Sequence, residues 1–416
     1  MSKNNTILII FISFFLIVGG LLFFYFSKNQ QPTNQPSITV NDPFGNIPGD
    51  RTPNIPSTGT STTSQGSSTS FGNVFSTLKQ IYKNPTSGSI FTTDKNNLNI
   101  LKFVDRAVGH TYEYPVLDQT GGPTRITNTT IPKIQEAVWS STGNELVYRF
   151  LDGDTDNISS FSSKIKPGDI SSTETTGEIT GLFLTANIKQ LVINPAGNKI
   201  FGLVDKSDKS GTFGITTNLD GSEKKVIFDS PASYWNISWP KDNIITFTTK
   251  PNNKDYGILY FLNIKENTFD RIISNHTGLS TITNKEASLV AYSYSENEQF
   301  VLDIYDVTKK LRSNINITTV SDKCVWGELD PKILYCAIPK IIAPNKYPDV
   351  WYQGVVSFND NVWKINTETG AMEELYQIGS NENAEIDAID LKISKDDSYL
   401  AFTNKKDLSL WLLKIK

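Results

Sequence analysis

The chain has 416 residues, which is enough for one large domain with appendages or for several smaller domains. Its formal net charge is only -4, and acidic and basic residues are interspersed, so the basic patch that nucleic-acid binding requires is missing. Aromatic residues make up 11% of the chain, and Thr, Ser, Asn, Val and Ile are frequent. Because these residues favour strands over helices, we expect an all-β domain.

An uncharged apolar segment follows a short N-terminal tail, residues 1–5. Residues 6–26 contain no charged side chain, and a helix of that length crosses roughly 30 Å of hydrocarbon. A cleaved signal peptide is the alternative, but no small-residue cleavage site follows the segment, and no nearby cysteine could carry a lipid. Residues 6–26 are therefore predicted to form a transmembrane helix.

Residues 27–70 are rich in Ser, Thr, Asn, Gln and Pro. Such a composition cannot bury enough apolar surface to fold, which predicts a disordered linker. Lys3 and Lys28 flank the apolar segment on opposite sides, so the charges alone do not decide its orientation. Because linkers of this kind usually face outward, we expect residues 71–416 to lie outside the cytoplasm, in a single-pass protein of the cell membrane.

A short pattern recurs along residues 71–416. It consists of an apolar anchor, a turn of Ser, Asn, Asp, Gly or Pro, and an apolar residue seven positions after the anchor. Each copy predicts a β-hairpin, because these are the residues that tight turns require. A shortened seventh copy joins Trp239 to Ile244. The other six are Phe91 with Leu98, Trp139 with Leu146, Ile193 with Ile200, Ile282 with Leu289, Trp326 with Ile333, and Ile393 with Leu400.

The spacing of the anchors predicts the architecture. Successive anchors are 43 to 67 residues apart, close to the roughly 40–50 residues of a four-stranded propeller blade. Seven anchors predict a seven-bladed β-propeller, with six or eight blades as the alternatives. The two longest intervals are expected to hold loop insertions, at 152–180 and 338–359. The last repeat is one strand short, and residues 74–82 are expected to complete it and close the ring.

Three segments carry a resemblance to known proteins. They are VDRAVGHTYEY (residues 104–114), KCVWGELDPKILYCAIPK (323–340) and YPDVWYQGVVSFNDNVWKI (347–365). Together with the N-terminal segment, they resemble an uncharacterised family of membrane-anchored, WD-repeat-like propellers from candidate-phyla bacteria. NLDGSEKKVIF (218–228) is similar to repeats of periplasmic translocation-type propellers. The resemblance implies a propeller at the cell envelope and implies no activity.

Two cysteines, Cys324 and Cys336, lie on the two strands of one predicted hairpin, at positions that nearly mirror each other about its turn. Facing residues of an antiparallel pair approach closely enough for a disulfide outside the cytoplasm. The alternative is a pair of small apolar side chains packed within the blade. Both interpretations are compatible with the sequence.

A carboxylate series, Asp152, Asp154 and Asp156, has the alternating spacing of a calcium-binding loop. The series departs from that pattern at two positions. Asn157 stands where a calcium-binding loop has its glycine, and Ser163 stands where the loop has its bidentate glutamate. These three residues are the candidate metal ligands, but a solvated hairpin turn is the preferred interpretation. We therefore expect no metal or other cofactor.

Aromatic residues are concentrated in and just after the second expected insertion. A loop that rises from a propeller face could present them to a protein or a glycan. The alternative is that the two tryptophans fill gaps between blades or cap the channel. Tyr234, Trp235 and Trp239, by contrast, are expected in the core. The candidate partner-binding residues are Tyr347, Trp351, Tyr352, Phe358 and Trp363.

The expected function is a binding or scaffold module at the cell envelope, for a protein or glycan partner. The chain has only two histidines, His110 and His276, and His276 is expected in a loop between strands. Two histidines leave little material for a His-based triad or a zinc enzyme. We therefore identify no catalytic residue and do not expect an enzyme. The alternatives are a propeller-type hydrolase or lyase acting on glycans, and a subunit of an envelope machine such as a pilus or secretion complex.

Overall fold

The computed structural model describes residues 77–117, 121–153, 157–166, 177–379 and 384–416. The chain divides into two units, Met1–Ser70 and Phe71–Lys416, and all described residues belong to the second. The predicted transmembrane helix at 6–26 and the predicted linker at 27–70 lie outside the described residues. In the part of the chain that is described, no helix has the length and apolarity needed to cross a membrane.

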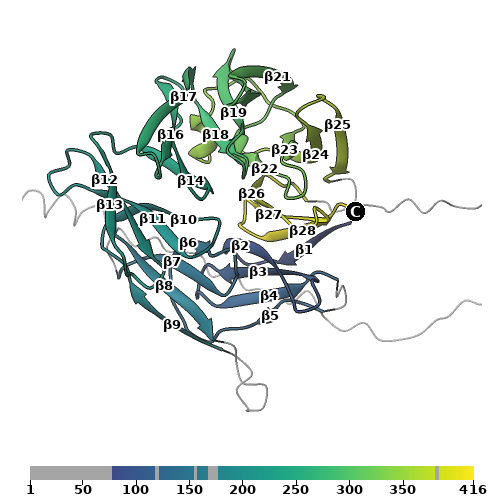
Figure 1. Cartoon of the computed structure of the whole chain (residues 1–416). Coiled ribbons are helices and arrows are strands. Elements are labelled where there is room, and N and C mark those ends of the chain that lie inside the picture. The colour runs from purple at the N-terminus through teal and green to yellow at the C-terminus, as the bar shows by residue number, and fades with distance from the viewer. Residues whose placement is uncertain (1–76, 118–120, 154–156, 167–176, 380–383) are drawn as a thin grey trace, which may run out of the picture. The chain divides into compact units, whose positions relative to one another are not determined.

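The second unit is a seven-bladed β-propeller, as the spacing of the anchors predicts. Seven antiparallel four-stranded sheets follow one another around a ring. In six sheets the strands are hydrogen-bonded in chain order and the first strand lies nearest the middle of the ring, whereas in the seventh β26 lies innermost and β1 outermost (Figure 1). We call the innermost strand the inner strand of its blade, and we call the space that the inner strands surround the channel.

The first three blades comprise residues 86 to 230. Blade 1 contains β2 (Thr86–Thr93), β3 (Asn99–Asp105), β4 (Thr111–Pro115) and β5 (Thr124–Arg125). Blade 2 contains β6 (Ile134–Trp139), β7 (Glu145–Leu151), β8 (Ile158–Lys166) and β9 (Glu178–Phe183). Blade 3 contains β10 (Ile188–Ile193), β11 (Lys199–Asp205), β12 (Thr212–Asn218) and β13 (Lys225–Ser230).

The next three blades comprise residues 235 to 377. Blade 4 contains β14 (Trp235–Lys241), β15 (Ile244–Thr249), β16 (Tyr256–Asn263) and β17 (Thr268–Thr277). Blade 5 contains β18 (Ser280–Thr283), β19 (Leu289–Glu296), β20 (Gln299–Asp306) and β21 (Leu311–Ile317). Blade 6 follows a short 3-10 helix (Ser321–Lys323) and contains β22 (Cys324–Trp326), β23 (Ile333–Pro339), β24 (Asp360–Asn366) and β25 (Met372–Gln377).

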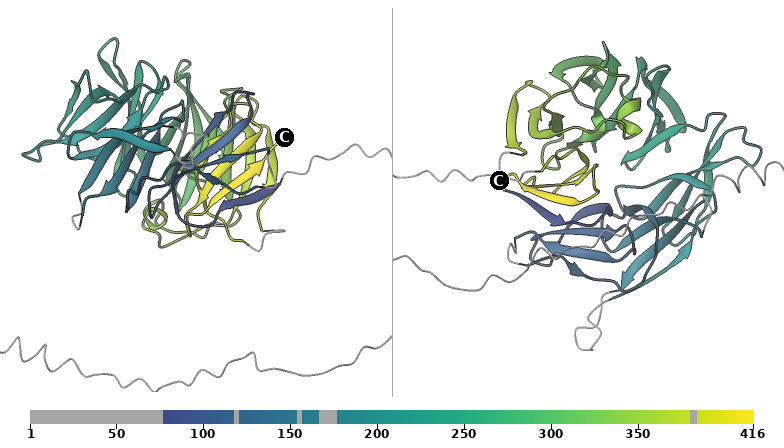
Figure 2. Two further views of the ribbon diagram at one scale, coloured as in Figure 1. Left: turned by 90° about the horizontal axis from the view of Figure 1, so that it is seen from below. Right: turned by 180° about the vertical axis from the view of Figure 1, so that it is seen from behind.

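Blade 7 joins the two ends of the propeller. It contains β26 (Ala388–Ile393), β27 (Tyr399–Asn404) and β28 (Leu410–Lys414), and its outer strand is β1 (Leu78–Tyr82). β1 pairs antiparallel with β28, so that Leu78 faces Leu413. Figure 2 shows this N-terminal strand beside the C-terminal strands. The prediction that residues near 74–82 complete the last blade is confirmed for the described positions.

The second strand of each blade is the most deeply buried, because neighbouring blades cover both of its faces. All six residues of β27 are buried, and so are the four central residues of β7, Leu146 to Arg149. The fourth strands are largely exposed, as in β25. The core therefore consists of layers between blades, which explains the nearly continuous apolar runs that follow each turn.

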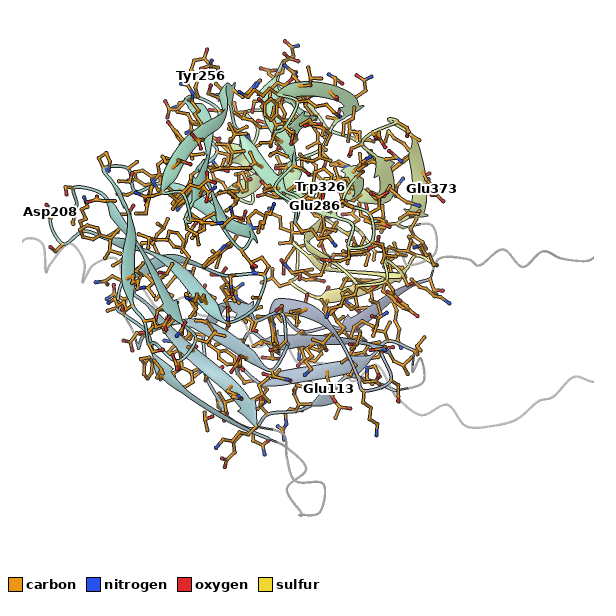
Figure 3. The ribbon with its side chains drawn as sticks, viewed as in Figure 1. Glu113, Asp208, Tyr256, Glu286, Trp326 and Glu373 are labelled. Carbon is orange, nitrogen blue, oxygen red and sulfur yellow. A yellow bond between two sulfur atoms is a disulfide. The ribbon has the colours of Figure 1, made fainter. Side chains whose placement is uncertain are left out.

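The anchors pack between blades. The indole Nε1 of Trp326 donates a hydrogen bond to the carbonyl of Ile282 in the preceding blade (3.2 Å), and Trp139 reaches Gly88 in the same way (3.3 Å). Figure 3 shows Trp326 toward the middle of the ring and Glu373 at its outer edge. Each anchor therefore marks the inner end of a blade.

In three hairpins the anchor faces the apolar residue seven positions after it. Trp139 faces Leu146, Ile193 faces Ile200, and Ile393 faces Leu400. In three others the anchor faces a residue further along the chain, because the turns are of other lengths. Phe91 faces Leu101, Ile282 faces Ala291, and Trp326 faces Leu334.

Three local predictions need correction. The interval 152–180 is no simple insertion, because strand β8 lies within it. Tyr234 is 74% exposed, whereas Trp235 and Trp239 are buried as expected, because Tyr234 precedes β14 and escapes the contact between blades. His276 lies in strand β17, where it pairs with Gly257, and not in a loop. The second expected insertion is confirmed: residues 340–359 connect β23 to β24 and contain α2 (Asp349–Tyr352).

Candidate functional site

The residue three positions before each anchor occupies an equivalent place in every blade, at or just before the inner strand. We call these seven the pre-anchor residues. Two of them, Leu279 and Lys323, are fully buried. The other five line cavities in the channel and at its rim. The seven are Gly88, Glu136, Gln190, Asn236, Leu279, Lys323 and Asp390.

Two adjoining cavities occupy the channel. The first channel cavity has a volume of about 480 Å³ and is lined mainly by the inner strands β26, β2 and β6. The second has a volume of about 570 Å³ and is lined mainly by β6, β10 and β14. Gln135 and Glu136 line both cavities, so the two adjoin there. We call the blades that supply these walls, 7 and 1 to 4, the open arc of the ring.

The inner strands of blades 7, 1, 2 and 3 are each irregular where they line these cavities. The pairing register shifts between Ile389 and Lys392 in β26, and at the corresponding places near the starts of β2, β6 and β10. β-Bulges are common next to functional sites, because they redirect side chains. Asp390 has a φ of 51°, a left-handed backbone that non-glycine residues adopt at a cost. The backbone of the open arc is thus shaped to turn polar side chains into the channel.

Gly88 illustrates how closely the open arc is packed. Its φ is 81°, and a Cβ atom at this position would lie 2.1 Å from the carbonyl oxygen of Ala137 on the next inner strand. Any side chain here would therefore push β2 and β6 apart. The glycine allows the two strands to approach, and the bulge of β2 depends on it.

Two ion pairs face the channel. Arg149, on β7, lies 3.2 Å from Glu136 and also donates to the carbonyls of Ile188 and Lys189. Partial desolvation inside the channel raises the pKa of Glu136 above its usual range, although the charge of Arg149 opposes this effect. On the other side, Lys392 lies 2.8 Å from Asp390, whose charge raises the pKa of Lys392. The glutamate side chain remains 53% exposed, which leaves it open to a ligand.

The insertion, residues 340–359, covers the remaining arc of the ring. The backbone N–H of Asn253 in blade 4 donates to Asp349 (2.9 Å), and the N–H of Asn345 donates to the carbonyl of Glu298 in blade 5 (3.0 Å). Lys405 in blade 7 donates to the carbonyl of Trp351 (2.7 Å). Because the insertion reaches three blades besides its own, it restricts access to the channel from that side.

A buried ionic network fastens the insertion. Nζ of Lys323 donates to Oδ2 of Asp360 (2.7 Å) and to Oδ1 of Asp387. The other oxygen of Asp387 accepts hydrogen bonds from the indole of Trp351 and the backbone N–H of Phe358, both at 3.0 Å. The three charged side chains are all 0% exposed. In blade 6 the pre-anchor position therefore holds the insertion in place and does not face the channel.

This network makes stability depend on pH through Asp360. Burial raises the pKa of its carboxyl to about 6, against the opposing charge of Lys323. The ordinary value is 3.8, so between the two values the folded state holds a proton that the unfolded state has lost. The contribution of this group to stability is thus fully present below pH 4 and is lost as the pH rises through about 6.

We therefore expect the unfolding free energy of the wild type, relative to that of Asp360→Asn, to fall by roughly 2–3 kcal/mol between pH 4 and pH 7. The amide does not titrate, so the comparison removes most of the pH dependence that both proteins share. Urea unfolding at each pH, followed by circular dichroism, measures the difference. A difference that stays constant or increases with pH would show that Asp360 does not carry this proton.

The candidate partner-binding aromatics do not form one exposed surface. Tyr347, Trp351 and Phe358 are at most 4% exposed and form a small core of their own within the insertion, so they cannot stack against a partner. These three residues therefore do not form the partner-binding surface that was considered for them. Their rings pack against one another and stabilise the short insertion. Nζ of Lys323 also lies 5.5 Å from the centre of the Trp351 ring.

The other two aromatics remain accessible, at different places. Tyr352 is 39% exposed and lines a rim pocket of about 400 Å³, together with Asp349 and Gln353 of the insertion. Asn236 lines both this rim pocket and the second channel cavity, so the two are neighbours. Trp363 lies on β24, is half-buried, and lines a separate groove between blades 5 and 6.

The cysteines and the carboxylate series have separate outcomes. Cys324 and Cys336 face each other on β22 and β23, with Cα atoms 4.1 Å apart, and are joined by a disulfide.

Asp152 lies in the turn after β7, where it accepts a hydrogen bond from Ser159, whereas positions 154 and 156 lie outside the described residues. Among the residues that are described, no group of three or more His, Cys, Asp or Glu could hold a metal ion.

The channel residues did not stand out in the sequence, although a signal was present. The pre-anchor positions hold Glu136, Gln190, Asn236 and Asp390 within strands that are otherwise largely apolar. A polar residue repeated at one register of a repeat unit indicates a common environment that is not the core. Aligning the repeats on their anchors would have identified this ring of residues.

Comparison with known proteins supports the fold. No protein-family model and no curated protein matches the chain. Among solved structures, a puromycin hydrolase is similar with a TM-score of 0.50 and 11% identity, over 76% of this chain and 50% of that chain. Oligogalacturonate lyase from Vibrio parahaemolyticus has a TM-score of 0.49 and 10% identity, over 82% and 99%. TolB from Acinetobacter baumannii has a TM-score of 0.41 and 10% identity, over 68% and 62%.

At such low identity the likeness concerns the fold alone, and folds of this kind serve many functions. The resemblance to the membrane-anchored propeller family of candidate-phyla bacteria remains a prediction. The chain is thus a seven-bladed β-propeller whose own residues must indicate its function.

Proposed function

We propose that this chain is a binding module, held outside the cell membrane by residues 6–26, which takes a segment of a partner protein into the open arc of its channel. The observation that carries the proposal is the run of bulged inner strands in blades 7, 1, 2 and 3. These irregularities bring charged and amide side chains into two adjoining cavities. The volumes lie in the range of roughly 300–1,000 Å³ that is typical of ligand sites.

The walls favour a protein segment over a glycan. Aliphatic side chains, among them Ile90, Val138 and Ile389, alternate with polar ones in the first channel cavity. Among the described residues that line the two channel cavities, the only aromatic side chain is Trp139, which is 9% exposed. A sugar ring is commonly held against an exposed aromatic face, whereas a peptide requires hydrogen-bonding groups beside apolar contacts. The exposed ring of Tyr352 at the rim then serves as an additional contact for the partner.

Site-specific photo-crosslinking tests this proposal in the full-length chain in its membrane. A photoreactive amino acid replaces Lys392 in the open arc, and in a control chain it replaces Glu373 on the outer strand β25 (Figure 3). We expect a protein partner to be crosslinked from position 392 and not from position 373. Mass spectrometry of the crosslinked product identifies the partner and the segment that enters the channel.

Two outcomes would contradict the proposal. Crosslinking of the same proteins from both positions would indicate nonspecific contact with the surface of the ring. A carbohydrate adduct at position 392, without a protein adduct, would favour a glycan ligand. Protease treatment of intact cells gives a separate test of the location, because an extracytoplasmic propeller is accessible from outside.

An enzyme is the second candidate, favoured by Glu136. This residue combines a raised pKa with a neighbouring arginine in an accessible cavity, which is typical of general acids and bases. If the chain is a glycan-active hydrolase or lyase, the purified protein should cleave polysaccharides and Glu136→Gln should abolish cleavage. Cleavage that persists in this variant would mean that Glu136 is not the catalytic residue.

A further inference from the structure

We propose that Arg106 binds the free C-terminal carboxylate of the partner segment in the first channel cavity. This inference rests on the proposed binding of a protein segment and specifies which part of that segment enters. It assigns a ligand chemistry to a residue that forms no ion pair with any other residue that the structure describes.

Arg106 is held so that its charged group faces the first channel cavity. It follows the last residue of β3, and its Nη2 donates a hydrogen bond to Oε1 of Gln135 at the start of β6 (2.9 Å). Nε2 of Gln135 in turn donates to the carbonyl of Lys133 (3.1 Å), which fixes the orientation of the amide. Both Arg106 and Gln135 line the cavity. One of the five guanidinium N–H groups is thus used for positioning, and the others are available to a ligand.

The other cations that line the channel cavities form ion pairs with carboxylates, and Arg106 differs from them in this respect. Arg149 lies 3.2 Å from Glu136, Lys392 lies 2.8 Å from Asp390, and Lys189 lies 3.5 Å from Asp205. Each of these cations therefore has a carboxylate partner. Across the described ranges, Arg106 forms no salt bridge, and its guanidinium donates a hydrogen bond to a neutral amide. A partly buried guanidinium with unused donors is suited to a planar, bidentate carboxylate.

The groups around Arg106 match a peptide terminus more closely than a small free anion. Glu136 and Asp390 are both substantially exposed, and their carboxylates can accept hydrogen bonds from backbone N–H groups. Ile90 and Ile389 offer an apolar surface to a side chain. A small anion would use the cation and would be repelled by the two carboxylates. The C-terminus of a chain combines a carboxylate, a nearby amide N–H and a side chain, so it can use all three kinds of group.

Binding of peptide pools to the full-length chain in detergent tests the inference. The first probe is a fluorescent, N-acetylated pool of random hexapeptides with a free C-terminal carboxylate. The second is the same pool with a C-terminal amide, and the third is an amidated pool with one internal aspartate. We expect the free-carboxylate pool to bind at least about tenfold more tightly than either amidated pool, because a charge-assisted bidentate contact is lost. Fluorescence anisotropy measures the affinities.

Variants locate the contact. Arg106→Gln is expected to reduce binding of the free-carboxylate pool to the level of the amidated pool, and Arg106→Lys to weaken it less, because the charge remains. Arg271→Gln is the matched control, since Arg271 is exposed on the outer strand β17, away from the channel cavities. Thermal unfolding of each variant verifies that the fold is retained.

Three results would overturn the inference. Equal binding of the free-carboxylate and amidated pools, with the wild type binding both, would leave the proposed function standing and reject the carboxylate contact. Preference for the pool with internal aspartate would assign Arg106 to an acidic side chain in place of the terminus. Absence of binding in all three pools, together with the absence of a crosslink from position 392, would reject the proposed function as well.

Discussion

Replacing Lys323 with methionine is expected to lower the unfolding free energy by about 3–5 kcal/mol. The substitution keeps most of the length of the side chain but removes the only cation that forms an ion pair with Asp360 and Asp387 among the described residues. Two fully buried carboxylates would then face each other without compensation. Proteins tolerate well-packed apolar replacements of whole ionic networks, whereas removal of one partner leaves buried charge unpaired. Urea unfolding near pH 7 measures the loss.

An exposed lysine provides the control for this substitution. Lys332 lies 2.7 Å from Glu368, a shorter separation than many surface ion pairs have, but both side chains are about half exposed. Lys332→Met is therefore expected to cost less than about 1 kcal/mol, because water screens the pair. Similar losses in the two variants would mean that the network at Lys323 is not buried as the structure has it.

Lys323→Met is also expected to loosen the insertion. Asp387 binds the indole of Trp351 and the backbone of Phe358, and its position depends on the cation. Hydrogen exchange in residues 340–359 should therefore increase more than exchange in β7, which has no contact with the network. Equal increases in both segments would indicate general destabilisation of the propeller.

Removing the disulfide has the second large expected effect. The double variant Cys324→Ala with Cys336→Ala is expected to lose about 2–5 kcal/mol of stability, the usual cost for a native disulfide. The bond joins residues 12 positions apart, on strands β22 and β23. It therefore restricts the unfolded chain in the segment that leads into the insertion. Thermal and urea unfolding measure the loss.

The single variants separate the crosslink from packing. Cys324→Ala alone already breaks the bond, so it should lose nearly as much stability as the double variant, and the two single losses should be far from additive. Wild-type protein unfolded in reducing agent should resemble the double variant. Additive single losses, without an effect of the reducing agent, would show that the cysteines contribute only as small buried side chains.

Much of the fold could be predicted from the sequence, because each blade repeats its own local signals. The anchor, the turn and the apolar residue after it occur within about ten residues, and the interactions they report, a tight turn and one hairpin, are local. The predicted hairpins at Trp139 and Ile393 are confirmed, and there Trp139 faces Leu146 and Ile393 faces Leu400. The outer strand of the last blade could also be predicted by counting strands, because a closed ring of seven four-stranded sheets needs one more strand there.

Local errors occurred where a residue's environment depends on other blades. Tyr234 and Trp235 are neighbours in the sequence, yet only Trp235 is covered by the adjacent blade. The sequence left two interpretations of the aromatic residues of 340–359 open, exposure on a loop or packing between blades. Enough of them are present to bury one another: Tyr347, Trp351 and Phe358 pack with Phe300 of blade 5. Composition shows the presence of aromatic rings, but their exposure depends on what packs against them.

The sequence by itself determined the number of blades and the order of the strands, because hairpins and turns are stabilised by residues close together in the chain. Only the tertiary structure decided the site. Glu136 and Asp390 belong to blades 2 and 7, 254 residues apart in the chain, and only closure of the ring brings them to one cavity. The equivalent position in blade 6, Lys323, is closed off by the insertion and two buried carboxylates. A repeat fixes where each pre-anchor side chain points, but the neighbouring blades and the insertion determine whether it meets a ligand or the core.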